Sequence, residues 1–127
     1  MKENFSKRVQ YIIKQSKEEA IRLGHSYVGS EHLWIGLLKS ETGMTKKIID
    51  VFDIDSNDMI SMIEDMIKSS GGTMTLGHLP LTRRAERILR NSFSEASACR
   101  EALADDQNVL FALLLESEGI ASDILKS

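Results

Sequence analysis

The stretch that decides the fold is SKEEAIRLGHSYVGSEHLWIGLLKSETG, residues 16–43. Its first part continues an amphipathic pattern that begins near residue 5 and stops at Gly24, a residue type that often ends helices. Its second part begins an apolar run after Ser30, whose hydroxyl can cap the first amides of a helix. The spacing predicts helices over about 5–23 and 31–40, joined by a short loop.

The same pattern returns later in the chain. Shifting the sequence by 76 residues aligns 5–51 with 81–127 without a gap. One helical face recurs with the same spacing: Phe5, Val9, Ile12, Ile13, Ser16, Ala20 and Leu23 match Leu81, Ala85, Ile88, Leu89, Ser92, Ala96 and Cys99. Small residues recur on the third and fourth turns, where another helix can approach closely. The sequence therefore predicts an all-α fold of two pseudo-symmetric helical repeats.

Further helices are predicted over about 44–52, 57–69, 83–99, 107–116 and 120–126, with caps at Asp55 or Ser56, Thr82, and Asp105 or Asp106. Met59, Met62 or Ile63, Met66 and Ile67 form the predicted apolar face of the fourth helix. We expect a single domain over 1–127, with repeat one at 5–69, a linker at 70–80 and repeat two at 81–127. A counterpart of the fourth helix would begin after Ser127, so the second repeat lacks its last helix. A homodimer could cover the apolar surface left open.

Composition excludes several classes of protein. The net charge of -3, from 16 basic and 19 acidic residues, disfavours a general nucleic-acid binder. The single cysteine, Cys99, excludes an internal disulfide and a cysteine zinc site, and it fits a reducing cytoplasm. Its match to Leu23 predicts a buried thiol. The sequence predicts neither a membrane span nor a signal peptide.

No catalytic motif is present. There is no nucleophile elbow and no phosphate loop, and His25, His32 and His78 lack the spacing of metal ligands. Capping, packing or surface exposure is expected for each histidine, and Trp34 is expected in the core. We therefore predict a non-enzymatic protein without cofactor or metal.

The most distinctive candidate site is the predicted helix start at Gly29, Ser30, Glu31 and His32. The first amides of a helix have no internal partners, and the dipole is positive there, so such a start favours an anion such as phosphate. Glu31 could hold a cation beside that anion. The alternative is that Ser30 and Glu31 only cap and stabilise the helix.

A second candidate is the cluster Arg83, Arg84, Arg87 and Arg90, partly mirrored by basic residues near the N-terminus. Because Glu86 and Glu95 interleave with these arginines, a solvated face is the simpler interpretation. The alternative is a docking patch for an acidic adaptor protein, with Arg83, Arg84 and Arg87 as the docking residues.

The quoted stretch resembles the first repeat of the Clp N-terminal (Clp repeat) domain family, nearest to the ClpC type. The family pattern is E-A-x-x-x-G-H, followed by Y-[IV]-G-[TS]-E-H-[IL]-L-x-G-L-L. Residues 81–125 match the second repeat more loosely, keeping T-x-R-A, the Leu-Leu pair and E-G-[IV]-A. The resemblance implies a domain ahead of AAA+ ATPase modules, which receives protein substrates and adaptors for delivery to a peptidase.

In some ClpC-type members the domain also binds phosphoarginine, with one site per repeat and a glutamate on the guanidinium. The resemblance carries this role to Gly29, Ser30, Glu31 and His32. The matching residues of the second repeat, Asp105, Asp106, Gln107 and Asn108, depart from the pattern. Gln107 lacks charge and the two aspartates would repel phosphate, so the second site is expected to be weak.

The leading hypothesis is therefore a docking domain of a ClpC-like unfoldase. The alternative is a free-standing regulator or adaptor of the same fold. A small helical nucleic-acid binder that uses the arginines is less favoured, and a small hydrolase least of all.

Overall fold

The computed structural model describes residues 4–41, 43–67 and 80–116. They form six helices: α1 (Lys7–Arg22), α2 (Ser30–Ser40), α3 (Gly43–Val51), α4 (Ser56–Met66), α5 (Arg83–Ala98) and α6 (Asp106–Leu115). The predicted all-α fold is confirmed. The predicted helix over 120–126, most of the predicted linker and His78 lie outside the described residues.

The helices of the two repeats begin at matching positions. α1 and α5 start 76 residues apart, as do α2 and α6. Ser6 and Thr82 are equivalent N-caps, whose hydroxyls accept the amides of Val9 and Ala85. The repeat in the sequence is therefore a repeat in the structure.

Each repeat is held by the other through short backbone pairings. The amide of Ser6 donates to Ala104 (2.8 Å), and the amide of Ala104 donates to Asn4 (2.9 Å). The equivalent bonds in the other direction join Thr82 to Val28 and Val28 to Pro80, each at 2.9 Å. The segment before the long helix of one repeat thus fixes the loop before the second helix of the other.

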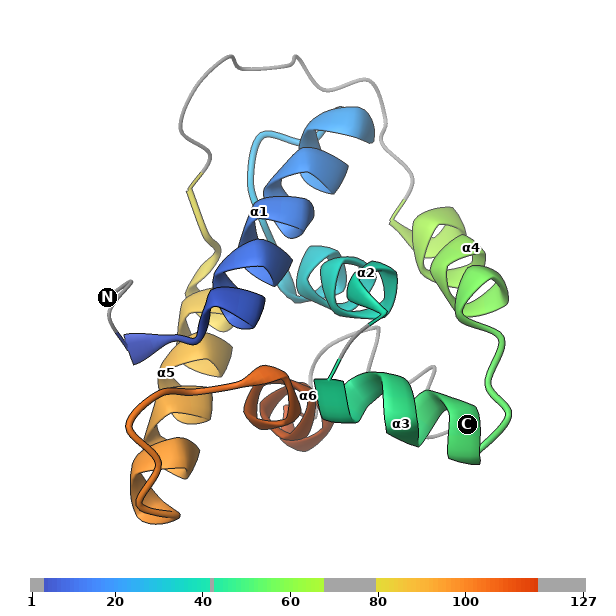
Figure 1. Ribbon diagram of the computed structural model, residues 1–127. Coiled ribbons are helices and arrows are strands. Elements are labelled where there is room, and N and C mark those ends of the chain that lie inside the picture. The colour runs from blue at the N-terminus through green and yellow to red at the C-terminus, as the bar shows by residue number, and fades with distance from the viewer. Residues whose placement is uncertain (1–3, 42, 68–79, 117–127) are drawn as a thin grey trace.

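The core is centred on α2 and α6 (Figure 1). α1 packs on α2, α5 packs on α6, and the two central helices also contact each other. Every residue of α2 from His32 to Leu38 is buried, and Trp34 lies in the core as expected. α4 covers a further side of α2, and α3 lies against α6.

α1 and α2 approach each other closely at Gly36 in α2. A Cβ there would stand 2.4 Å from the Ser16 hydroxyl and 2.6 Å from the Ile12 carbonyl oxygen of α1. The small residues in the repeated pattern therefore mark a helix crossing, as predicted. In the second repeat the equivalent pair is Ser92 and Ala112.

Three details differ from the sequence expectations. Cys99 is exposed rather than buried, because it lies in the segment 97–100 at the end of α5, all of which is exposed. Met66 is also exposed, since the register of α4 turns Ile60 inward as well as Ile63, and of the two alternatives Met62 or Ile63 it is Ile63 that is buried. The N-cap of α2 is Gly29, and Ser30 is the first helical residue.

We predict that Gly36→Ala lowers the free energy of unfolding by at least about 1 kcal/mol, because the added methyl group collides with the α1 backbone. Alanine otherwise favours a helix over glycine by about 1 kcal/mol, so any loss reports the collision. Urea denaturation measures the change. Gly29→Ala is the matched control, because its Cβ would find no atom nearer than 3.5 Å. Equal effects of the two substitutions would contradict this explanation.

Candidate functional site

The start of α2, Gly29 to His32, is a helix N-terminus without a side-chain cap. Gly29 has extended backbone (φ -104°) and no side chain to accept the first helical amides. Gly29, Ser30 and His32 are buried, while Glu31 is partly exposed. The first amides and the helix dipole give this start a positive potential, which the first-turn carboxylate of Glu31 balances in part.

His32 holds the turn from inside. Its Nδ1 accepts the Gly29 amide at 2.9 Å, and its Nε2 lies 2.7 Å from Nδ1 of His25. Because Nδ1 of His32 is an acceptor, the proton of its neutral form lies on Nε2 and is donated to His25. Both nitrogens are therefore engaged within the chain, and His32 holds the turn in position.

Burial lowers the pKa of His32 from 6.5 to about 4, with a further lowering by the charge of His25. Glu31 and Glu19 oppose this lowering, without reversing it. The imidazole is 2% exposed and is thus neutral under physiological conditions.

Glu31 and Tyr27 flank the same backbone position from the solvent side. A Cβ on Gly29 would lie 3.5 Å from Oε1 of Glu31 and 3.7 Å from the Tyr27 ring. Oε1 of Glu31 accepts the Ser30 hydroxyl at 2.9 Å, and Tyr27 is about half exposed. A carboxylate beside an aromatic ring suits a planar guanidinium, which can pair with the first and stack on the second.

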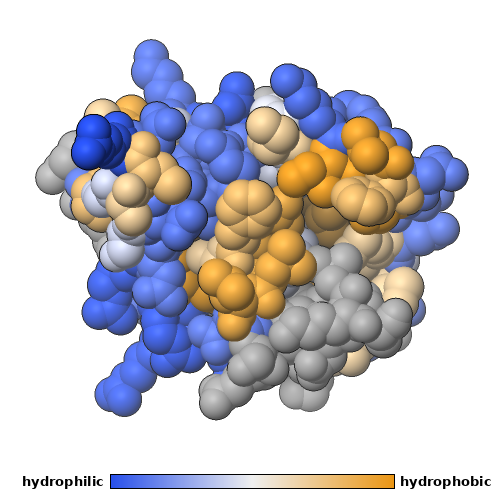
Figure 2. Space-filling view, turned by 90° about the horizontal axis from the view of Figure 1, so that it is seen from below, coloured by the Kyte–Doolittle hydropathy of each residue, from blue (hydrophilic) through white to orange (hydrophobic). Residues whose placement is uncertain are grey.

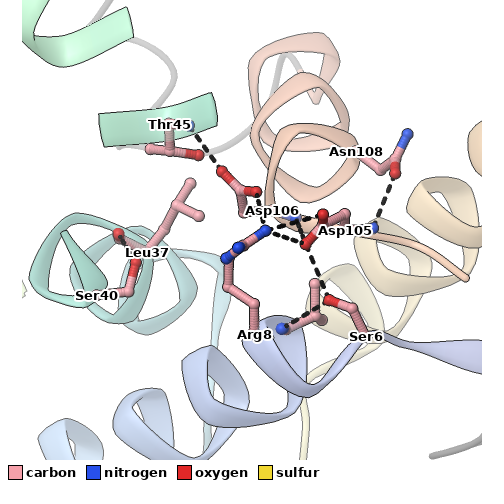
Figure 3. Close-up of polar contacts among 9 residues, drawn as sticks. Ser6, Arg8, Leu37, Ser40, Thr45, Asp105, Asp106 and Asn108 are labelled. Carbon is pink, nitrogen blue, oxygen red and sulfur yellow. Dashed lines mark hydrogen bonds and ion pairs between the residues drawn. The ribbon is translucent and has the colours of Figure 1, made fainter. Parts of the chain in front are cut away.

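The start of α6, Asp105 to Asn108, has the same cap hydrogen bond as the start of α2, but here the N-cap residue carries a carboxylate (Figure 3). Asn108 Oδ1 accepts the Asp105 amide at 2.9 Å, as His32 does for Gly29. The Asp105 carboxylate accepts the Asp106 amide (2.9 Å), the Ser6 hydroxyl (2.9 Å) and Nη1 of Arg8 (2.9 Å). A carboxylate of the chain thus takes up the donors at this helix start.

Asp105 is stabilised in its ionised form. Burial alone would raise its pKa, but the hydrogen bonds from the Asp106 amide and Ser6, together with the charge of Arg8, hold the pKa below its usual range. Its neighbour Asp106 is fully buried, and Oδ2 accepts the Thr45 amide at the start of α3 at 2.7 Å. A Cβ on Gly43 would come within 2.4 Å of that carboxylate, so Gly43 leaves room for it. The two aspartates therefore join α1, α3 and α6 (Figure 3).

The structure separates the predicted arginine candidates. Arg87 donates to Glu116 through Nε at 3.0 Å, Arg83 is exposed, and Arg84 is half-buried. Arg84 is the counterpart of Arg8, whose guanidinium donates a hydrogen bond to the Asp105 carboxylate. The sequence repeat contained this identity, but the role of Arg8 becomes visible only where α1 meets the start of α6.

Neither a metal site nor a membrane span is found in the described part of the chain. No group of three or more histidine, cysteine or acidic residues there could hold a metal ion. None of the helices in that part is both long and apolar enough to cross a membrane.

We predict that His32 makes stability depend on pH. The unfolded chain takes up a proton at the ordinary histidine pKa, whereas the folded protein resists until about pH 4. Stability is therefore full above pH 6.5 and falls as the pH drops toward 4, by about 3 kcal/mol over the whole interval. Urea denaturation between pH 7 and pH 4.5 measures the slope.

The control is His32→Asn, which places in repeat one the residue that does the same task in repeat two. Asparagine keeps an acceptor for the Gly29 amide but does not titrate. We expect this variant to be less stable at pH 7 and to lose most of the slope. An unchanged slope would show that another group causes it.

The chain and its structure match known proteins. The family model of the Clp repeat (R) N-terminal domain matches residues 4–127. The ATP-dependent Clp protease ATP-binding subunit ClpC of Staphylococcus saprophyticus is 32% identical over 94% of this chain, and ClpC of Staphylococcus aureus strain USA300 is 33% identical over the same share. The chain spans 14% of the length of these relatives.

Solved structures agree on the fold. The N-terminal domain of the ClpD chaperone from Arabidopsis thaliana superposes with a TM-score of 0.77 at 16% identity, covering 98% of this chain and 84% of that one. The Hsp104 N-terminal domain from Candida albicans gives 0.80 at 15% identity, covering 98% and 81%. With the family match over nearly the whole sequence, these likenesses show that the chain belongs to the Clp N-terminal domain family.

Proposed function

We propose that this chain is a docking domain of a ClpC-like, ATP-dependent unfoldase in the cytoplasm. It captures protein substrates and adaptors and passes them to AAA+ modules, on the same or a partner chain, which feed a peptidase. The family match and the ClpC relatives support this role. The domain itself supplies binding rather than catalysis.

The ligand proposed for the start of α2 is phosphoarginine on tagged proteins. The observation that carries this proposal is the difference between the two helix starts. The α6 start holds the Asp105 carboxylate against amide and guanidinium donors, whereas the α2 start has Gly29 at the equivalent position and no such anion. A phosphate at the α2 start would take the place that the carboxylate has at the α6 start.

The equivalence of the two repeats also suggests which basic residue would pair with the phosphate. Arg84 stands on α5 where Arg8 stands on α1, and Thr82 stands where Ser6 stands. Since Ser6 and Arg8 both donate to Asp105, the equivalent donors for a phosphate at the α2 start are Thr82 and Arg84. The guanidinium of the ligand would then pair with Glu31 beside Tyr27.

The α6 start is proposed to bind weakly at most. Its Asp105 carboxylate already uses the donors, and Gln107 stands where Glu31 stands in repeat one. An incoming phosphate would have to displace a paired carboxylate and would meet its charge.

Calorimetric titration of the purified chain with phosphoarginine tests this assignment, with arginine and phosphoserine as comparison ligands. We expect selective binding of phosphoarginine at one dominant site. Glu31→Ala should weaken it by about 2 kcal/mol, roughly thirtyfold in Kd, because a charge-assisted pair is lost. Gln107→Ala should leave the affinity unchanged. Equal losses from both substitutions would contradict the single-site proposal.

Arg84→Gln and Arg83→Gln form a matched pair, since both remove one positive charge from the same turn of α5. We expect Arg84→Gln to weaken binding of phosphoarginine clearly more than Arg83→Gln. Equal effects would show that only the general positive field matters. A folded chain that binds none of the three ligands would overturn the phosphoarginine assignment.

A further inference from the structure

Two histidine rings lie against each other next to the start of α2. Nδ1 of His25 and Nε2 of His32 are 2.7 Å apart, which is a hydrogen-bond distance, and the ring centroids are 4.9 Å apart. His25 lies in the loop between α1 and α2 and is partly exposed, whereas His32 in α2 is 2% exposed. The pair therefore joins that loop to the first turn of α2.

A third hydrogen bond fixes where the protons of this pair lie. Nδ1 of His32 accepts the Gly29 amide at 2.9 Å, so the proton of His32 lies on Nε2 and points at His25. A hydrogen bond needs one donor and one acceptor, and Nδ1 of His25 is therefore the unprotonated acceptor. The bond between the two rings exists only while His25 is neutral, with its own proton on Nε2.

A proton added to His25 enters at Nδ1 and makes this arrangement impossible, because two N–H groups would then point at each other. Either the His25 ring turns away, or His32 moves its proton to Nδ1 and loses the Gly29 amide. The second change would leave a buried amide without an acceptor, whereas the partly exposed His25 ring can bind water instead. The ring that moves on protonation is therefore His25.

The position of Tyr27 depends on the same ring. The Tyr27 ring stacks on His25, with centroids 5.8 Å apart and 18° between the planes, and it meets His32 edge-on with centroids 6.0 Å apart. Its other side is exposed, since Tyr27 keeps about half of its surface in contact with solvent. When His25 turns away, Tyr27 loses its stacking partner and the loop loses its bond to α2.

The charged groups around the two rings come from three elements. Glu31 of α2 and Glu19 of α1 bring negative charge to the pair, and Glu19 is itself paired with Arg22 and Lys39. The segment 80–82 is Pro-Leu-Thr and has no titratable side chain, and the arginines that follow it at the start of α5 stay charged throughout. Only the loop histidine has a proton whose uptake is incompatible with the bond between the rings.

We propose that His25 is a pH-sensitive positioning residue of the candidate site. Neutral His25 holds Tyr27 beside Glu31, and protonated His25 releases Tyr27 together with the loop between α1 and α2. The bond between His32 and the Gly29 amide stays intact during this change. The release is a property of the chain itself, whereas its effect on a ligand rests on the proposed binding of phosphoarginine.

NMR spectra of the chain without ligand, recorded between pH 8 and pH 5, test the release directly. At pH 8 we expect the ring-nitrogen signals to show His32 protonated on Nε2 and His25 unprotonated on Nδ1. On acidification the nuclear Overhauser contact between the rings of Tyr27 and His32 should be lost, with the same midpoint as the titration of His25. The Gly29 amide should stay protected from hydrogen exchange, because burial lowers the pKa of His32 to about 4.

His25→Asn and His25→Ala form a matched pair of variants. Asparagine keeps an oxygen acceptor for the His32 ring but does not titrate, whereas alanine removes the acceptor at every pH. In both variants the contact between Tyr27 and His32 should become independent of pH, and it should be strong with asparagine and weak with alanine. A pH transition that persists in His25→Asn would overturn the proposal, as would a proton on Nδ1 of His32 at pH 8.

The change should be confined to the loop. Hydrophobic residues gather on the face that Figure 2 shows from below, whereas the loop between α1 and α2 starts at the upper end of α1 in Figure 1. Release of the loop leaves that face as it is, so the fluorescence of the hydrophobic dye ANS should stay constant through the transition. A rise with the same midpoint would show acid expansion of the whole domain and would overturn the proposal.

Calorimetric titration with phosphoarginine, above and below the midpoint found by NMR, tests the positioning role. Between the two pH values the Kd of the unmodified chain should rise at least about threefold more than that of His25→Asn, because the ring beside the ligand guanidinium is released. Equal changes in the two proteins would overturn the positioning role. Absence of phosphoarginine binding at both pH values would count against the proposed function, whereas the spectra without ligand decide the release of the loop.

Discussion

The reciprocal backbone pairing of the two repeats is the constraint on which the rest of the structure depends. Residues 80–82, just before α5, fix Val28, and Val28 directly precedes the N-cap of α2. Residues 4–6, just before α1, fix Ala104 directly ahead of the N-cap of α6. Each helix start is thus held by bonds from the other repeat as well as by the cap bonds of its own. The candidate site at Gly29 is therefore a product of the whole domain, although its residues are contiguous in sequence.

The two repeats share this backbone arrangement but differ in the charged residues at equivalent positions. In repeat one the helix start is open and the outer surface of α2 is closed by α4, with Glu19 neutralised by two cations. In repeat two the helix start is closed by Asp105 and Arg8, and Glu95, the counterpart of Glu19, forms no ion pair with the described residues. The two helix starts thus differ in one charged residue, and that residue decides whether the donors at the start are satisfied within the chain.

The side chains that hold the two helix starts differ between the repeats, but the backbone bond that they accept is the same. His32 and Asn108 each accept a hydrogen bond from the amide of the N-cap residue of their helix. Both bonds are 2.9 Å long. The imidazole adds a second bond, to His25, and ties the loop before α2 to the helix. The loop that carries Tyr27 is therefore braced from within, and the turn is preorganised beside the solvent-facing Glu31.

The sequence by itself determined the helices, the repeat and the family, because apolar spacing and cap residues are local signals that a shift of 76 residues displays directly. Gly29, Ser30, Glu31 and His32 could be named from the same local pattern. Only the tertiary structure decided what these residues do. Whether Cys99 is buried depends on what packs over the end of α5, and whether the α6 start is open depends on Arg8, which is remote in sequence. Burial and charge pairing between distant residues arise from packing, and one-dimensional periodicity does not contain them.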